Sequence, residues 1–117
     1  MDDYYRRSVE ILLKYQSESG AYLACPNFPT YQYAWLRDGS FCALALDLTG
    51  QTGSADRFHH WGMGILRHYQ AKLRACIDLA QKGGNPPSSA CLHSRFTVDG
   101  DEVPGNWGHH QLDGLGT

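Results

Sequence analysis

The chain has 117 residues, which is the length of one small domain and too short for a complete large barrel of about 250 residues. Hydrophobic residues make up 42% and charged residues 19%, a globular composition that excludes low-complexity disorder. The net charge of -2 and the lack of a basic stripe argue against a nucleic-acid partner, and no apolar run reaches the roughly 20 residues of a membrane-spanning helix.

The first predicted element is an amphipathic helix that ends near Gly20, a residue type common just after helices. Residues 21–24 follow as a short extended piece, and residues 25–30, with two prolines, as a loop. The helix carries its apolar face at helical spacing, on Tyr5, Val9, Leu12, Leu13 and Gln16.

A second helix is predicted to begin after Trp35 or at Asp38. Its stretch 41–46 is apolar on nearly every side, which is typical of a buried helix. Residues 49–53, with two glycines, end it.

The third predicted helix is long, with Ser54 as its N-cap and Gly83 at its end. Residues 95–103 then show the pattern of a tight β-hairpin with Asp99 and Gly100 at the turn. The apolar face of the long helix comprises Phe58, Trp61, Ile65, Tyr69, Leu73, Cys76, Ile77 and Ala80. The predicted fold class is therefore all-α with a short hairpin.

The first candidate site is the segment 31–39, which reads YQYAWLRDG. Tyr31, Tyr33 and Trp35 alternate, so an extended backbone would place them on one face. Aromatic rings stack on the C–H face of a sugar, and the charged side chains of Arg37 and Asp38 can hydrogen-bond vicinal hydroxyls. The alternative interpretation is structural: core aromatic residues followed by Asp38 as a helix N-cap.

The second candidate site is the segment 106–114, which reads NWGHHQLDG. It again combines a tryptophan, an amide and a carboxylate with glycines, which let a backbone approach a ligand closely. A turn leading into a helix capped by Asp113 would explain the same residues without a ligand.

Other site chemistries find little support in the sequence. No histidine pair has the spacing of a zinc-binding helix, and the four cysteines form no C-x-x-C pair, so we expect no metal. The start Met1-Asp2-Asp3 is unlike a signal peptide, so we expect a cytoplasmic protein with reduced cysteines and no membrane partner. The alternative for the cysteines is a disulfide that involves Cys25 or Cys91.

Together the two segments resemble glycoside hydrolase family 15, the glucoamylase-like enzymes. An aromatic run ending in W-x-R-D lies at 26–41, residues 95–99 look like the segment that leads to the family's second motif, and W-G-x-x-Q-x-D-G lies at 107–114, in the family's order. The resemblance implies that residues 1–117 are the N-terminal part of a catalytic domain, a partial (α/α)6 toroid with only its first helices. The apolar second helix would lie in the inner ring, and a truncated ring would leave apolar surface exposed on it.

Family roles can be carried over to matching positions. Arg37 and Asp38 match the pair that hydrogen-bonds the non-reducing-end sugar in the innermost subsite. Trp35 matches a wall residue, Tyr31 a tyrosine near the attacking water, and Trp107 a tryptophan that packs over the substrate. Gln111 and Asp113 match residues of the pocket rim or its support, whereas His109 departs from the arginine of some fungal members.

The resemblance implies an inverting hydrolase of α-linked glucose oligosaccharides or polysaccharides, without a cofactor. Both catalytic glutamates of the family lie downstream of the second motif, so we assign no catalytic residue to this chain and expect it to need the C-terminal remainder of its domain. One alternative is a glucoamylase-like regulatory domain similar to the phosphorylase kinase regulatory subunits. Another is a small non-catalytic sugar-binding helical module.

Overall fold

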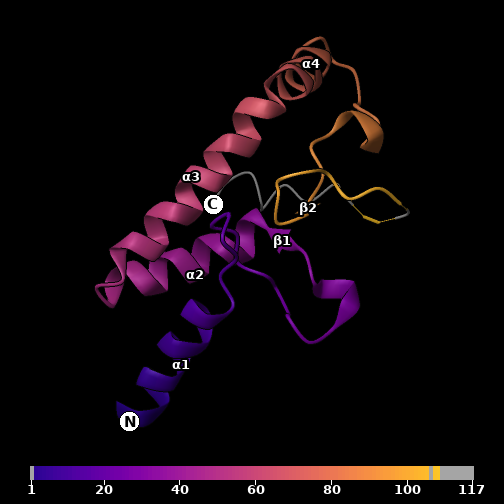
Figure 1. The fold of residues 1–117 in the computed structure, drawn as a ribbon. Coiled ribbons are helices and arrows are strands. Elements are labelled where there is room, and N and C mark those ends of the chain that lie inside the picture. Colours follow the sequence, from indigo (N-terminus) through magenta and orange to yellow (C-terminus); the bar gives the residue numbers. More distant parts are fainter. Residues whose placement is uncertain (1, 106, 109–117) are drawn as a thin grey trace.

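The computed structural model describes residues 2–105 and 107–108, and its fold is helical with one small antiparallel sheet, as predicted (Figure 1). No helix among these residues is long and apolar enough to cross a membrane. The helices are α1 (Asp2–Lys14), α2 (Leu36–Leu48), α3 (Thr52–His68) and α4 (Gln70–Gln81), the strands are β1 (Ala34–Trp35) and β2 (Arg95–Phe96), and two 3-10 turns span Pro29–Tyr31 and Ser88–Ala90.

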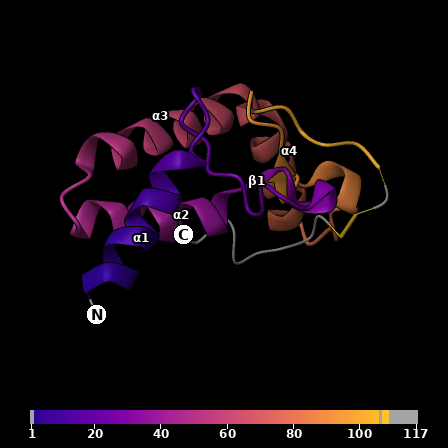
Figure 2. The ribbon, with the colours of Figure 1, turned by 60° about the horizontal axis from the view of Figure 1, so that its bottom comes forward.

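The core lies where α2 and α3 run side by side (Figure 2). Ala43 and Leu46 of α2 are fully buried there, and Phe58 of α3 is 3% exposed. Gly39 makes the close approach possible, since a Cβ at this position would lie 2.1 Å from the Phe58 ring. The glycine that follows Asp38 in the first motif is therefore a packing residue.

The opposite side of α2 is exposed and apolar, as expected for an inner helix without its neighbours. Phe41 is 63%, Leu44 53% and Leu48 79% exposed. The predicted apolar face of α1 is confirmed in part. Val9, Leu12 and Leu13 pack against the core, whereas the Tyr5 side chain is exposed to solvent.

The predicted start of the second helix directly after Trp35 is confirmed, whereas Asp38 and Ser54 as helix caps are wrong. Helix α2 begins at Leu36 with Trp35 in the N-cap position, so Asp38 is an acidic residue of the first turn and not the cap. Helix α3 begins at Thr52, two residues before Ser54. The Ser54 hydroxyl is buried and hydrogen-bonds Gln16 Oε1 and Tyr22 Oη, so it joins α3 to the N-terminal segment instead of capping a helix.

The single long helix predicted for residues 54–83 is also wrong, because it is divided at Tyr69 into α3 and α4, which point in different directions (Figure 1). The Tyr69 hydroxyl accepts a hydrogen bond from the Glu102 amide, and its ring lies 6.2 Å from that of Phe96. Tyr69, where the helix axis changes direction, is thus held by a distant segment, and the break occurs without a proline.

The predicted hairpin at 95–103 is confirmed in a short form. Phe96 bridges Glu102, and the Thr97 amide donates to the Asp101 carbonyl. In addition, β2 pairs with β1, which brings Ala34 opposite Phe96 and Trp35 opposite Arg95. This pairing places residues 95–96, which precede the second motif, beside residues 34–35 of the first motif.

Candidate functional site

Three aromatic residues of the two motifs come together in the structure. The ring centroids of Tyr31 and Trp35 are 5.9 Å apart. The Trp107 indole meets both rings edge-on, at 6.1 Å from Trp35 and 6.3 Å from Tyr31. Two motifs separated by about 70 residues of chain thus form one aromatic cluster, which we call the aromatic wall (Tyr31, Trp35, Trp107).

Local structure explains how Tyr31 and Trp35 meet. The segment is not one extended strand as predicted, because Pro29–Tyr31 forms a 3-10 turn before β1 begins. The Tyr31 carbonyl accepts a hydrogen bond from the Cys25 amide, which fixes the turn against the preceding loop. Trp35 is 4% exposed and Tyr31 42%, so the wall has a buried base and an accessible edge.

Arg37 and Asp38 follow the wall directly, in the first turn of α2. The Arg37 guanidinium lies 3.4 Å from the Asp38 carboxylate, and their side chains are 37% and 41% exposed. Asp38 also borders a hollow of about 660 Å³ between α1 and α2, together with Arg7, Tyr15 and Phe41. Both charged groups are therefore accessible to the hydroxyls of a ligand.

Tyr33 is not part of the aromatic wall, although the alternation of residues 31, 33 and 35 predicted that all three rings share one face. Its ring instead faces the Arg95 guanidinium, whose Cζ lies 4.9 Å from the ring centroid. The same guanidinium lies 4.4 Å from the centroid of Trp107. The sequence analysis gave Arg95 no role in the site, since its placement beside these rings depends on the pairing of β1 with β2.

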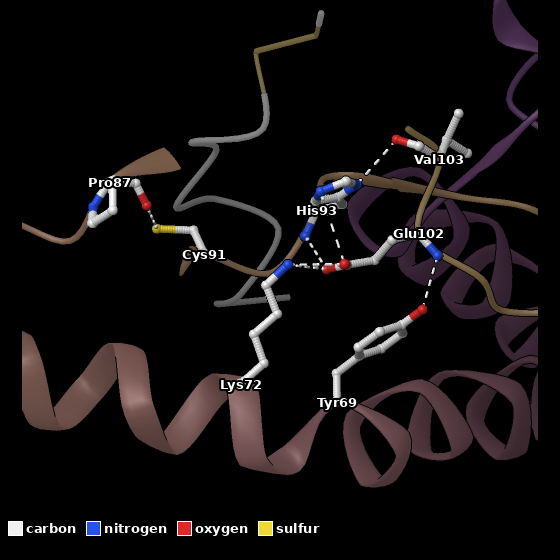
Figure 3. Close-up of polar contacts among 7 residues, drawn as sticks. All are labelled: Tyr69, Lys72, Pro87, Cys91, His93, Glu102 and Val103. Carbon is white, nitrogen blue, oxygen red and sulfur yellow. Dashed lines mark hydrogen bonds and ion pairs between the residues drawn. The ribbon is translucent and has the colours of Figure 1, made fainter. Parts of the chain in front are cut away.

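A polar cluster around Glu102 fixes the segment that leads to Trp107 (Figure 3). The Glu102 carboxylate accepts hydrogen bonds from Lys72 Nζ at 2.8 Å and from the His93 amide at 2.9 Å. His93 Nδ1 lies 3.0 Å from the Val103 carbonyl. We call Lys72, His93 and Glu102 the Glu102 cluster.

Burial raises the pKa of the Glu102 carboxyl, but the hydrogen bonds from Lys72 and His93 outweigh burial and hold this pKa below its ordinary value. Glu102 is therefore ionised at neutral pH and fully occupied in fixing α4 to residues 93–103. This structural role is consistent with the sequence analysis, which assigns no catalytic residue to this chain.

Gln111 and Asp113, and with them His109, lie outside the described residues. Of the predicted site residues within the described part, the structure joins Tyr31, Trp35 and Trp107 by ring contacts and pairs Arg37 with Asp38. The two groups adjoin along the chain, because Trp35 of the wall ends β1 and Arg37 and Asp38 lie in the first turn of α2.

Comparison with known proteins gives consistent matches. The chain is 38% identical over 112 residues to an isomaltose glucohydrolase of Kribbella flavida, covering 95% of this chain and 29% of that protein. It is 41% identical over 112 residues to an uncharacterized glycosyl hydrolase of Methanocaldococcus jannaschii, covering 87% of this chain and 18% of that protein.

Solved structures agree with the sequence matches. A wild-type glycosidase superposes with a TM-score of 0.88 at 37% identity over 97% of this chain and 31% of that chain. A variant of it in complex with glucose gives the same values. The fold is thus that of part of an α/α-type glycosidase, and the chain spans less than a third of the length of these relatives. The profile of the glycosyl hydrolases family 15 matches residues 1–117, so the chain belongs to this family.

Proposed function

We propose that the chain is the N-terminal part of a glucoamylase-like catalytic domain and supplies one side of the pocket for the terminal glucose of an α-glucoside. The observation that carries the proposal is the junction of the aromatic wall with the Arg37–Asp38 pair. Flat rings beside two exposed charged groups suit a sugar, which has an apolar C–H face and a rim of hydroxyls.

The relatives support α-linked glucose oligosaccharides or polysaccharides as the substrate class. One relative is named for isomaltose, and a solved relative holds glucose. In this proposal Asp38 accepts and Arg37 donates hydrogen bonds to sugar hydroxyls, and Trp35 and Trp107 form the wall.

Inverting glycosidases need a general acid and a general base about 6.5–9.5 Å apart, with room for the attacking water. We assign neither role to this chain, because Glu102 is held by Lys72 and His93 and Asp38 serves binding. The remaining two-thirds of the domain would supply both groups. Its helices would also cover Phe41, Leu44 and Leu48, whose exposure is unusual for a finished domain.

Binding is tested by titrating the chain with glucose, maltose and isomaltose while recording the indole signals in a ¹H–¹⁵N spectrum. Signals of Trp35 and Trp107 are expected to shift with saturation, and Asp38→Asn is expected to weaken binding at least tenfold. Asp47→Asn is the matched control, because Asp47 is an exposed residue of the same helix. Equal affinity in the two variants would contradict the role of Asp38.

Hydrolysis gives a second test. Incubation of the purified chain with maltose or isomaltose is expected to release no glucose above the protein-free control. Measurable release that persists in a repurified sample would place a complete acid and base within these 117 residues and overturn the division of roles.

A further inference from the structure

Arg95 occupies an unusual position next to the aromatic wall. Its guanidinium lies between two aromatic rings, with Cζ 4.9 Å from the centroid of Tyr33 and 4.4 Å from that of Trp107. Its Nε is buried and has no hydrogen-bond partner in the part of the chain that the structure describes. The two ring faces are therefore the main environment of this cation, and a cation–π contact strengthens when the cation is desolvated.

The backbone around Trp107 does little to fix the indole. Trp107 lies two residues after Gly105, which has a φ of 115°, and outside any helix or strand. Its amide donates to the Gly105 carbonyl, a contact within the same short segment. The orientation of the indole must then come from side-chain contacts, which are the edge contacts with Trp35 and Tyr31 and the face contact with Arg95.

Arg95 is itself held rigidly. It pairs with Trp35 across β1 and β2, and its carbonyl accepts a hydrogen bond from the Val103 amide. The Glu102 cluster anchors the neighbouring residue of that returning segment to α4. A planar guanidinium on this support fixes the angle of a ring stacked on it, which the flexible ammonium of a lysine does not.

We propose that Arg95 is a positioning residue of the sugar pocket, whose guanidinium is clamped by Tyr33 and holds the Trp107 indole against Trp35 and Tyr31. Arg95 acts on Trp107, and through it on the shape of the aromatic wall. The effect on sugar binding rests on the proposed function, whereas the effect on the orientation of Trp107 does not.

The test uses the three indole N–H signals of the ¹⁵N-labelled chain, assigned with Trp107→Phe. Arg95→Met, which keeps the apolar stem, is expected to shift the Trp107 and Trp35 signals. The signal of Trp61, which hydrogen-bonds the Val98 carbonyl, is expected to stay and reports that the core is intact. Arg95→Lys is expected to shift Trp107 by an intermediate amount. Arg74→Met, at an exposed site on α4, is the matched control.

Tyr33→Leu separates positioning from a general loss of structure. Tyr33 reaches Trp107 through Arg95, so Tyr33→Leu should shift the Trp107 signal in the unaltered chain and leave it unmoved in an Arg95→Met background. Unchanged Trp107 and Trp35 signals in Arg95→Met would overturn the proposal. If Arg95→Met unfolds the chain, the Trp61 signal is lost, and Arg95→Lys and Tyr33→Leu then decide by the same criterion.

A sugar titration adds a readout that a merely structural residue would not move. With the Trp61 signal in place, Arg95→Met is expected to weaken glucose or isomaltose binding about tenfold, and Arg95→Lys less, as a misplaced wall requires. If the unaltered chain binds no sugar, the proposed function fails while the indole signals still decide the positioning role. Shifted indole signals with unchanged affinity would overturn the link between Arg95 and the pocket.

Discussion

The chain fixes its elements to one another in two different ways. The contact between α2 and α3 is apolar, with Leu46 and Phe58 buried and Gly39 giving the close approach. The contact between α4 and residues 93–103 adds polar bonds to looser packing: Leu73 of α4 is only partly buried against the core, and Lys72 donates to the Glu102 carboxylate. Apolar packing supplies most of the stability, whereas the polar contact sets direction and register at a smaller and pH-dependent gain.

The largest effect is expected from Leu46→Ala in the apolar contact. Leu46 is fully buried, so truncation removes transfer free energy and leaves a cavity, a loss of about 2–5 kcal/mol. The free energy of unfolding from urea titration measures it. The control is Leu44→Ala, because Leu44 lies on the exposed face of the same helix and is 53% exposed. Equal losses in the two variants would contradict the assignment of buried and exposed faces.

The next effect comes from locking the polar region covalently. Cys76 of α4 and Cys91 have Sγ atoms 3.7 Å apart. With oxidised glutathione, one thiolate attacks the reagent and the second displaces the bound glutathione thiol, so one protein disulfide and two glutathione thiols form. Closing this 15-residue loop is expected to stabilise the chain by about 3 kcal/mol.

Mass spectrometry of the peptides around both cysteines checks the linkage, and urea titration the stability. Burial and the Cys76 contact raise the pKa of the Cys91 thiol, so the exchange should accelerate with rising pH. Cys76→Ser should abolish both effects, whereas Cys25→Ser should leave them. A mixed disulfide that never resolves would show that the two sulfurs cannot reach bonding distance.

A smaller loss is expected from Glu102→Gln, which keeps the acceptor for the His93 amide but removes the charge facing Lys72. We expect about 1.5 kcal/mol at pH 7, the lower end for a hydrogen bond to a charged group, because the Lys72 side chain is 25% exposed. The measurement is urea titration, with the exposed Glu10→Gln as control.

The same pair of variants tests the pH dependence. The folded-state pKa of Glu102 lies below the ordinary value of 4.5, so its contribution is fully present above that value and is lost as the pH falls through the folded-state pKa. The difference between the unaltered chain and Glu102→Gln should therefore shrink below about pH 4.5. A difference that stays constant down to pH 3 would contradict the lowered pKa.

The smallest effect is expected from Leu44→Gln on the exposed face of α2. Because Leu44 is 53% exposed, we expect a change below about 0.5 kcal/mol in the free energy of unfolding. Sedimentation velocity should show less self-association than in the unaltered chain, since an exposed apolar patch is reduced. A loss above 2 kcal/mol would show that this face packs within the chain.

Sequence reasoning succeeded where the deciding physics is local or where a motif is spaced characteristically. Helical periodicity located α1 and α2, and the two motifs singled out Tyr31, Trp35 and Trp107, whose rings the structure brings into contact. It failed where a contact with a residue far along the chain determines the local structure. Ser54 has the character of a local cap, yet it bonds Gln16 and Tyr22.

The division at Tyr69 and the placement of Arg95 have the same origin. Tyr69 bonds an amide 33 residues further on, and Arg95 depends on a strand pair joining residues 34–35 to 95–96. No local propensity carries that information, because neither position has the proline or glycine that marks a break.

Gly39 has a consequence for how variants of this chain would be interpreted. It adjoins Asp38 on one side and the Phe58 ring on the other, where any side chain would collide at 2.1 Å. A methyl group there pushes α3 away from the helix end that carries the charged pair. In a mutational screen scored only on sugar affinity, Gly39 would therefore rank with the contact residues although no atom of it needs to touch a ligand. A parallel measurement of folding stability in the same variants would identify Gly39 as a packing residue and not a contact residue.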